Sequence, residues 1–211
     1  MISENIQKIL FDNIHIYEEK NNKDYFICFS IGKNHVPEYE EICFRSENYW
    51  HLLACKLHEG ENEQIYAKCL NGEDITKYIG IAEGHTLKDV YEKEKVFKGV
   101  FDFVRRAKEV KIAYANGADQ DTFTMAIGKD NIVGYGRPKG CNTGLMFPKS
   151  CQTKSIGRIT RVPKKILFIL SKQKTESKYT QVEYIASKKE PFIHNQIINE
   201  CFSELELFDL K

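Results

Sequence analysis

The feature that most restricts the fold of this 211-residue chain is a change of hydrophobic periodicity near Lys108. Before this point apolar residues recur every three or four positions, most clearly between Leu87 and Lys108, and Thr86 can cap that helix. After it, short runs follow a two-residue period and are separated by turn residues such as Asn116-Gly117. Helices followed by a run of strands predict an α+β fold with an antiparallel sheet, rather than alternating strands and helices.

The same patterns predict the extent of the elements and their grouping. We expect helices at residues 3–10, 46–57, 62–70 and 87–108, and strands at 15–18, 25–31, 111–114, 122–127, 131–135, 144–147, 166–170 and 179–185. The main sheet should have about four to six strands. We expect residues 1–36 to form an N-terminal helix and hairpin extension, residues 37–190 the main α+β domain, and residues 191–211 an acidic C-terminal helix.

Charge is distributed unevenly along the chain. Residues 131–175 contain 10 Lys or Arg and no Asp or Glu, whereas the remaining residues contain 21 basic and 30 acidic side chains. Such a segment favours binding to a polyanion, and the most common polyanion is a nucleic-acid backbone. The alternative is that these cations pair with acids elsewhere on the surface.

Several classes of protein are disfavoured by the sequence. No apolar run approaches the roughly 20 residues of a membrane-spanning helix, and the N-terminus does not resemble a secretory signal, so we expect no membrane partner. The seven cysteines are odd in number and lack a C-x-x-C pair, which favours a reducing, cytoplasmic location. Neither a glycine-rich phosphate loop nor a metal-binding motif occurs, so we expect no cofactor and no metal.

His51 is the first candidate for chemistry. On a helix starting near Ser46, Asn48 and His51 share one edge, so the amide can hold the imidazole in one tautomer. An imidazole of near-neutral pKa is the usual base for removing a proton from a ribose 2′-hydroxyl. Arg45 lies at the preceding strand end and can reach the same cleft. The alternative is that His51 is a core histidine beside Trp50.

This segment also carries a family resemblance. The pattern Phe44-x-x-x-Asn48-Tyr-x-His51-Leu52, followed by Lys56-Leu57 and a helix ending in Asn71-Gly72-Glu-Asp-Ile-Thr76, resembles the fourth subgroup of phage-associated nuclease domains grouped with barnase, EndoU, colicin and RelE. Phe101-x-Phe103-Val-Arg105-Arg106 and residues 142–153 extend the resemblance, which covers about residues 41–185. Leu53-Ala54 is a departure, because those domains have a glycine-containing step there.

The resemblance implies a barnase/RelE-like fold and a metal-independent ribonuclease, toxin-like or encoded by a phage or mobile element. Such enzymes cut RNA, including tRNA, through attack of the 2′-hydroxyl on phosphorus, and an antitoxin or inhibitor protein is a common partner. It implies His51 as general base or acid and a phosphate held by Arg45 and Arg105. The remaining site residues would be Lys154 as the stabilising cation, with Asn48, Ser150, Thr153, Arg158, Arg161 and Lys164 binding substrate.

Two other functions fit the same sequence. The chain can be a non-catalytic nucleic-acid- or nucleotide-binding protein of phage or host defence, since it lacks a long, specific catalytic signature. It can also act through protein contacts, with the acidic tail covering the basic segment or recruiting a basic partner. That tail contains Glu200, Glu204, Glu206 and Asp209.

Overall fold

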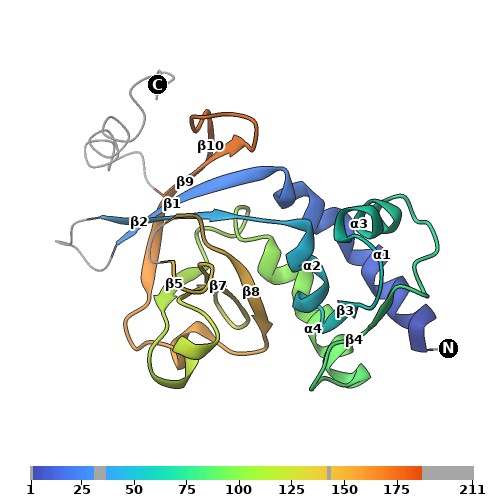
Figure 1. Ribbon diagram of the computed structural model, residues 1–211. Coiled ribbons are helices and arrows are strands. Elements are labelled where there is room, and N and C mark those ends of the chain that lie inside the picture. The colour runs from blue at the N-terminus through green and yellow to red at the C-terminus, as the bar shows by residue number, and fades with distance from the viewer. Residues whose placement is uncertain (1, 31–36, 142–143, 187–211) are drawn as a thin grey trace.

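The computed structural model describes residues 2–30, 37–141 and 144–186. Helices lie on one side of a large, curled antiparallel sheet (Figure 1). The helices are α1 (Ile2–Asn21), α2 (Ser46–Leu52), α3 (Asn62–Leu70) and α4 (Leu87–Phe101), with short 3-10 turns η1 (Gly117–Asp121) and η2 (Ile156–Arg158). None of the helices in these ranges is both long and apolar enough to cross a bilayer.

The main sheet contains eight strands in the described ranges, so the expected four to six strands were too few, although the α+β class holds. Seven of them follow the order β2-β1-β9-β5-β6-β7-β8. The strands are β1 (Lys23–Ser30), β2 (Glu38–Cys43), β5 (Lys111–Tyr114), β6 (Met125–Gly128), β7 (Ile132–Gly136), β8 (Phe147–Gln152), β9 (Lys164–Gln173) and β10 (Gln181–Ile185). A separate two-stranded sheet joins β3 (Cys55–Leu57) to β4 (Ile79–Ile81).

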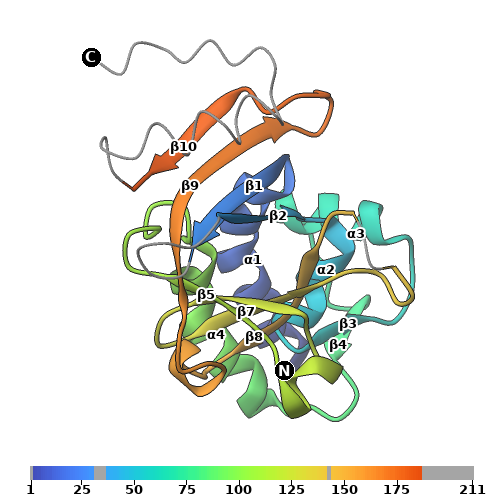
Figure 2. The same cartoon turned by 90° about the vertical axis from the view of Figure 1, so that its left-hand side faces the viewer.

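The long strand β9 organises this sheet. One edge of β9 pairs with β1, and the other is shared between β5 at its start and β10 at its end (Figure 2). The two ends of the strand order also meet, because Ile42 and Met146 form a parallel bridge. Cys43 N donates to Met146 O at 2.8 Å, and Met146 N donates to Glu41 O at 2.8 Å. The sheet therefore curls far enough for β2 to contact the segment entering β8.

The expected N-terminal hairpin extension is wrong. Residues 15–18 lie within the 20-residue helix α1, because apolar residues at helical spacing continue from Ile6 through Ile14 to Tyr17 and are all buried. The helix packs against α3 and α4, and β1 pairs with both β2 and β9, so both elements contribute to the common core. The acidic C-terminal helix expected at residues 191–211 lies outside the described residues.

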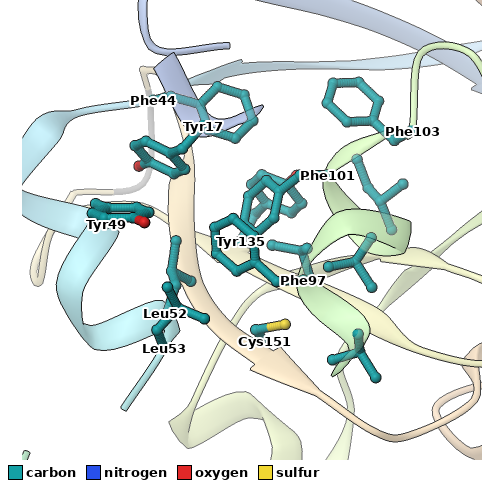
Figure 3. Close-up of a cluster of buried hydrophobic side chains, with 14 of the residues drawn as sticks. Tyr17, Phe44, Tyr49, Leu52, Leu53, Phe97, Phe101, Phe103, Tyr135 and Cys151 are labelled. Carbon is teal, nitrogen blue, oxygen red and sulfur yellow. The ribbon is translucent and has the colours of Figure 1, made fainter. Parts of the chain in front are cut away.

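An aromatic cluster joins the helices to the sheet (Figure 3). The Tyr17 ring on α1 contacts Phe44, just after β2, at 5.7 Å and Tyr49 on α2 at 5.2 Å between ring centroids. Tyr49 Oη donates to Leu10 O at 2.5 Å, and Tyr17 Oη donates to Arg45 O at 2.9 Å. Buried hydroxyls usually need a hydrogen-bond partner, so these two bonds hold α2 in a fixed orientation relative to α1. That orientation sets the direction in which the side chains of α2 point.

Most helix boundaries follow local signals. The helix α3 matches the expected range, and α4 begins after Thr86, whose hydroxyl and Asp89 form a reciprocal capping box. The helix ends at Phe101 rather than Lys108, and Arg106 folds back to donate to Gly99 O at 3.0 Å. At α2 the N-cap residue is Arg45, while Ser46 Oγ accepts a hydrogen bond from Asn62.

Candidate functional site

A cavity of about 530 Å³ opens beside the edge strand β8. Its walls come from the end of α2, the segment between β4 and α4, the first half of α4, and β8 with the residues that follow it. The lining residues are His51, Ala82, His85, Asp89, Glu92, Lys93, Thr122, Lys149, Ser150, Cys151, Gln152, Thr153 and Lys154. Four residues proposed from the sequence, from segments about a hundred positions apart, therefore meet there: His51, Ser150, Thr153 and Lys154.

His51 lies in the last turn of α2 and is partly buried. Burial lowers the pKa of its imidazole below the ordinary value of 6.5, and the nearby ammonium of Lys93 lowers the pKa further. Hydrogen bonds with the backbone of Pro148 and Lys149 act in the opposite direction without reversing the shift. The ring is therefore largely neutral at pH 7, which is the state that a general base needs.

Lys93 projects from α4 toward strand β8. Its Nζ donates to Cys151 O at 3.3 Å, and burial lowers the pKa of its ammonium. Lys93 is three residues after Val90 and four before Phe97, so it lies on the apolar stripe of the helix. A lysine interrupting an apolar stripe is the sequence signal that could have identified this residue, which belongs to no motif.

The segment before α4 adds a second imidazole. His85 is exposed at the cavity wall, and its charge lowers the pKa of Asp89, after the two Thr86 hydrogen bonds that dominate that shift. Glu92 also lines the cavity. The cavity thus contains three lysines, two histidines and two carboxylates, which is a mixed rather than a purely basic surface. His85 gave no sequence signal because it stands in a turn with no motif around it.

Polar side chains of β8 and its continuation complete the wall. Gln152 Nε2 donates to Ser150 Oγ at 2.8 Å, so the serine hydroxyl remains able to donate in turn. Lys154 Nζ contacts both oxygens of Asp119, at 2.7 and 2.6 Å. Much of the charge of Lys154 is therefore neutralised within the protein. Thr153 is exposed at the opening.

Other predicted site residues lie elsewhere. Asn48 is buried, it does not line the cavity, and its Oδ1 has no hydrogen-bond partner among the described residues. The expected role of Asn48 in orienting His51 is wrong, because no hydrogen bond joins the two side chains in the described residues. Arg45 caps α2, pairs with Glu47 at 3.6 Å and lies over the Phe147 ring. Neither residue contributes to the cavity wall.

The remaining cations are dispersed. Arg105 lines a different cavity, beside Glu19, and Arg158 and Arg161 are exposed near η2 without lining the His51 cavity. Lys164 is buried, pairs with Glu38 at 2.6 Å and lies over the Tyr114 ring, so it is not available for substrate. The structure thus places these four residues away from His51.

The acid-free segment is partly neutralised across the sheet. Within the described residues, three of its cations form ion pairs with acids from other segments. These pairs are Arg137–Glu40 at 2.5 Å, Lys154–Asp119 at 2.6 Å and Lys164–Glu38 at 2.6 Å. Pairing with distant acids, the alternative explanation of the charge asymmetry, therefore accounts for part of it.

The turn after α2 contains a non-glycine residue in the left-handed region. Ala54 has a φ of +57°, a conformation that favours glycine. Searches against family models, curated proteins and solved structures found no match to the chain. In the described ranges no three His, Cys, Asp or Glu side chains are arranged to hold a metal ion.

Proposed function

We propose that this chain is a metal-independent ribonuclease whose active site is the His51 cavity. The observation that supports it is a largely neutral imidazole beside a lysine in an open cavity that also contains a second imidazole. We extend the proposal to a toxin-like or phage-encoded effector acting on cytoplasmic RNA, including tRNA, with an antitoxin or inhibitor protein as a further partner. The family resemblance is the basis for that extension.

In this proposal His51 and His85 divide the proton transfers. His51 takes the proton of the ribose 2′-hydroxyl, the 2′-oxygen bonds to phosphorus, and the bond from phosphorus to the 5′-oxygen breaks. His85, whose ring lines the same cavity, gives a proton to that 5′-oxygen. The products are a 2′,3′-cyclic phosphate and a free 5′-hydroxyl.

The other cavity residues would stabilise the charge that builds on the phosphoryl oxygens. Lys93 is close enough to His51 to affect its pKa, so its ammonium is the best-placed cation. Ser150 and Thr153 can each donate a hydrogen bond from the β8 side. Lys154 contributes less than the sequence suggested, since Asp119 holds it.

A second candidate function is binding of nucleic acid or a nucleotide without catalysis. The observation that favours it is that His51 and Lys93 both contact the backbone of β8. These contacts cover the outer edge of β8. They would serve this structural purpose even in a protein without catalytic activity.

Incubation of total tRNA with the purified protein in EDTA distinguishes these functions. The ribonuclease hypothesis predicts fragments with 2′,3′-cyclic phosphate ends, which a denaturing gel and end-specific phosphatase treatment identify. His51→Ala should abolish cleavage, whereas His15→Ala, at an exposed position of α1 outside the cavity, should not. Salt-sensitive binding with the RNA recovered intact would favour the second function and reject the first.

A further inference from the structure

A second cavity, of about 430 Å³, lies where the end of α1, the start of β1, the turn after α4 and β10 come together. It shares no lining residue with the His51 cavity. The charged and polar residues around it are Glu19, Lys20, Lys23, Tyr25, Arg105 and Glu183. Three of these lining residues are cations and two are carboxylates, and Asp102 outside the lining also lies 3.8 Å from Arg105.

Two hydrogen-bond donors that line this cavity make no hydrogen bond to a described residue, and their polar atoms are not sealed from the cavity space. The Lys20 side chain is only 7% exposed, and its ammonium contacts Glu19 at 3.8 Å, which is too long for a hydrogen bond. The Tyr25 side chain is 1% exposed overall, and its residue lines the cavity without being among the fully buried, unpartnered polar groups of the described residues. Burial, with the charges of Glu183 and Glu19, raises the pKa of Tyr25, so the hydroxyl stays protonated. Both donors are therefore available to an acceptor that enters the cavity.

The two carboxylates of the cavity, Glu183 and Glu19, differ in their hydrogen bonding and exposure. Glu183 accepts from Lys23 at 2.7 Å and from Ser171 at 2.6 Å, so its charge is satisfied within the protein. Glu19 is 55% exposed and lies between Lys20 and Arg105 at 3.8 and 3.6 Å. An incoming anion can therefore replace Glu19 beside both cations by a movement of one exposed side chain.

We propose that this second cavity binds the phosphate group of a small phosphorylated molecule. Lys20 and Arg105 supply positive charge, and the Tyr25 hydroxyl donates a hydrogen bond. Donors of three different kinds around one space suit a tetrahedral group with several oxygens better than a planar carboxylate with two. The cavity volume exceeds that of a phosphate ion, which leaves room for the attached organic group.

Isothermal titration of the full chain with inorganic phosphate, glycerol phosphate and acetate, at constant ionic strength, tests this site. We expect saturable binding of both phosphates and weaker binding of acetate. Tighter binding of glycerol phosphate than of inorganic phosphate would identify an esterified ligand, and the reverse order would overturn that part of the proposal.

Variants localise the site. Arg105→Gln and Lys20→Met should each weaken phosphate binding about tenfold or more, since hydrogen bonds to charged groups are lost. Tyr25→Phe should weaken it severalfold, and Glu19→Gln should strengthen it because the competing carboxylate is gone. Lys98→Met, at an exposed position of α4 outside the cavity, should change nothing.

Two results would overturn the proposal. One is the absence of saturable phosphate binding in both the unmodified chain and Glu19→Gln. The other is unchanged binding in Arg105→Gln and Tyr25→Phe, which would place the anion elsewhere. Because Arg105 is exposed and Tyr25→Phe removes a single oxygen, these variants remain informative even if Lys20→Met fails to fold.

Discussion

Replacing His51 by alanine should separate catalysis from folding. If His51 is the general base, its removal lowers kcat/KM roughly 100- to 10,000-fold, the range typical of such groups. That loss corresponds to about 3 to 5 kcal/mol of transition-state stabilisation, at about 1.4 kcal/mol for each factor of ten. The residue matters less for folding, because the aromatic contacts that hold α2 come from Tyr17 and Tyr49 and remain intact.

The stability of the variant can be bounded from its contacts. The His51 ring is partly buried near the backbone of Pro148 and Lys149, and substitutions at such positions commonly cost about 0.5 to 3 kcal/mol. A loss of this size leaves a folded protein if the total stability is within the usual range of about 5 to 15 kcal/mol. Urea unfolding followed by circular dichroism measures this change.

The assay compares initial rates of tRNA cleavage in EDTA for equal amounts of folded protein. His15→Ala is the matched control, because the ring is exposed on α1 and lies outside the cavity. The control should stay within about twofold of the unmodified chain in rate and about 0.5 kcal/mol in stability. A His51→Ala protein that is folded and retains more than about a tenth of the activity would refute the assignment of the base.

Three further predictions concern the same cavity. Lys93→Met should raise the pKa of His51 and move the acidic limb of the pH–rate profile to higher pH. Lys95→Met, at an exposed position of α4, should leave the profile unchanged. An unmoved acidic limb in Lys93→Met would contradict the effect of Lys93 on the His51 pKa. His85→Ala should strongly slow the cleavage of RNA. It should barely change the cleavage rate of uridine 3′-(4-nitrophenyl phosphate), because the leaving group of that substrate needs no proton. Equal losses of rate on both substrates would exclude His85 as the general acid. Since the folded state lowers the pKa of His51, it binds fewer protons than the unfolded chain, and stability should fall as the pH drops through 6.5. Urea titrations at several pH values should show that fall, and His51→Gln should reduce it.

Local sequence predicted the elements whose signals are local. The helix α3 and the strand β5 have the expected bounds, since their caps and periodicity lie within their own segments. The first part of strand β2 was not predicted because three of its residues are glutamates, which are depleted in strands. Two of them pair with Lys164 and Arg137, more than 90 positions away, so the compensation is visible only in the folded chain.

The difference between local and long-range signals also explains which residues of the His51 cavity could be predicted from the sequence and which could not. His51 and the β8 residues could be proposed because each belonged to a recognisable segment. His85 and Lys93 reach the site through the placement of α4 against β8, which no local pattern encodes. Arg105 was expected to hold a phosphate beside His51. The turn after α4 instead directs its guanidinium to the second cavity, beside Glu19.

The edge of β8 has a consequence for self-association. β8 is a terminal strand of the sheet, and such strands can recruit a second chain through unpaired backbone groups. Met146 bonds to β2 just before it, and the side chains of His51 and Lys93 occupy its backbone further along. The side chains proposed for RNA cleavage thus also shield this strand from intermolecular pairing. A chain that lost both would carry an open template for aggregation.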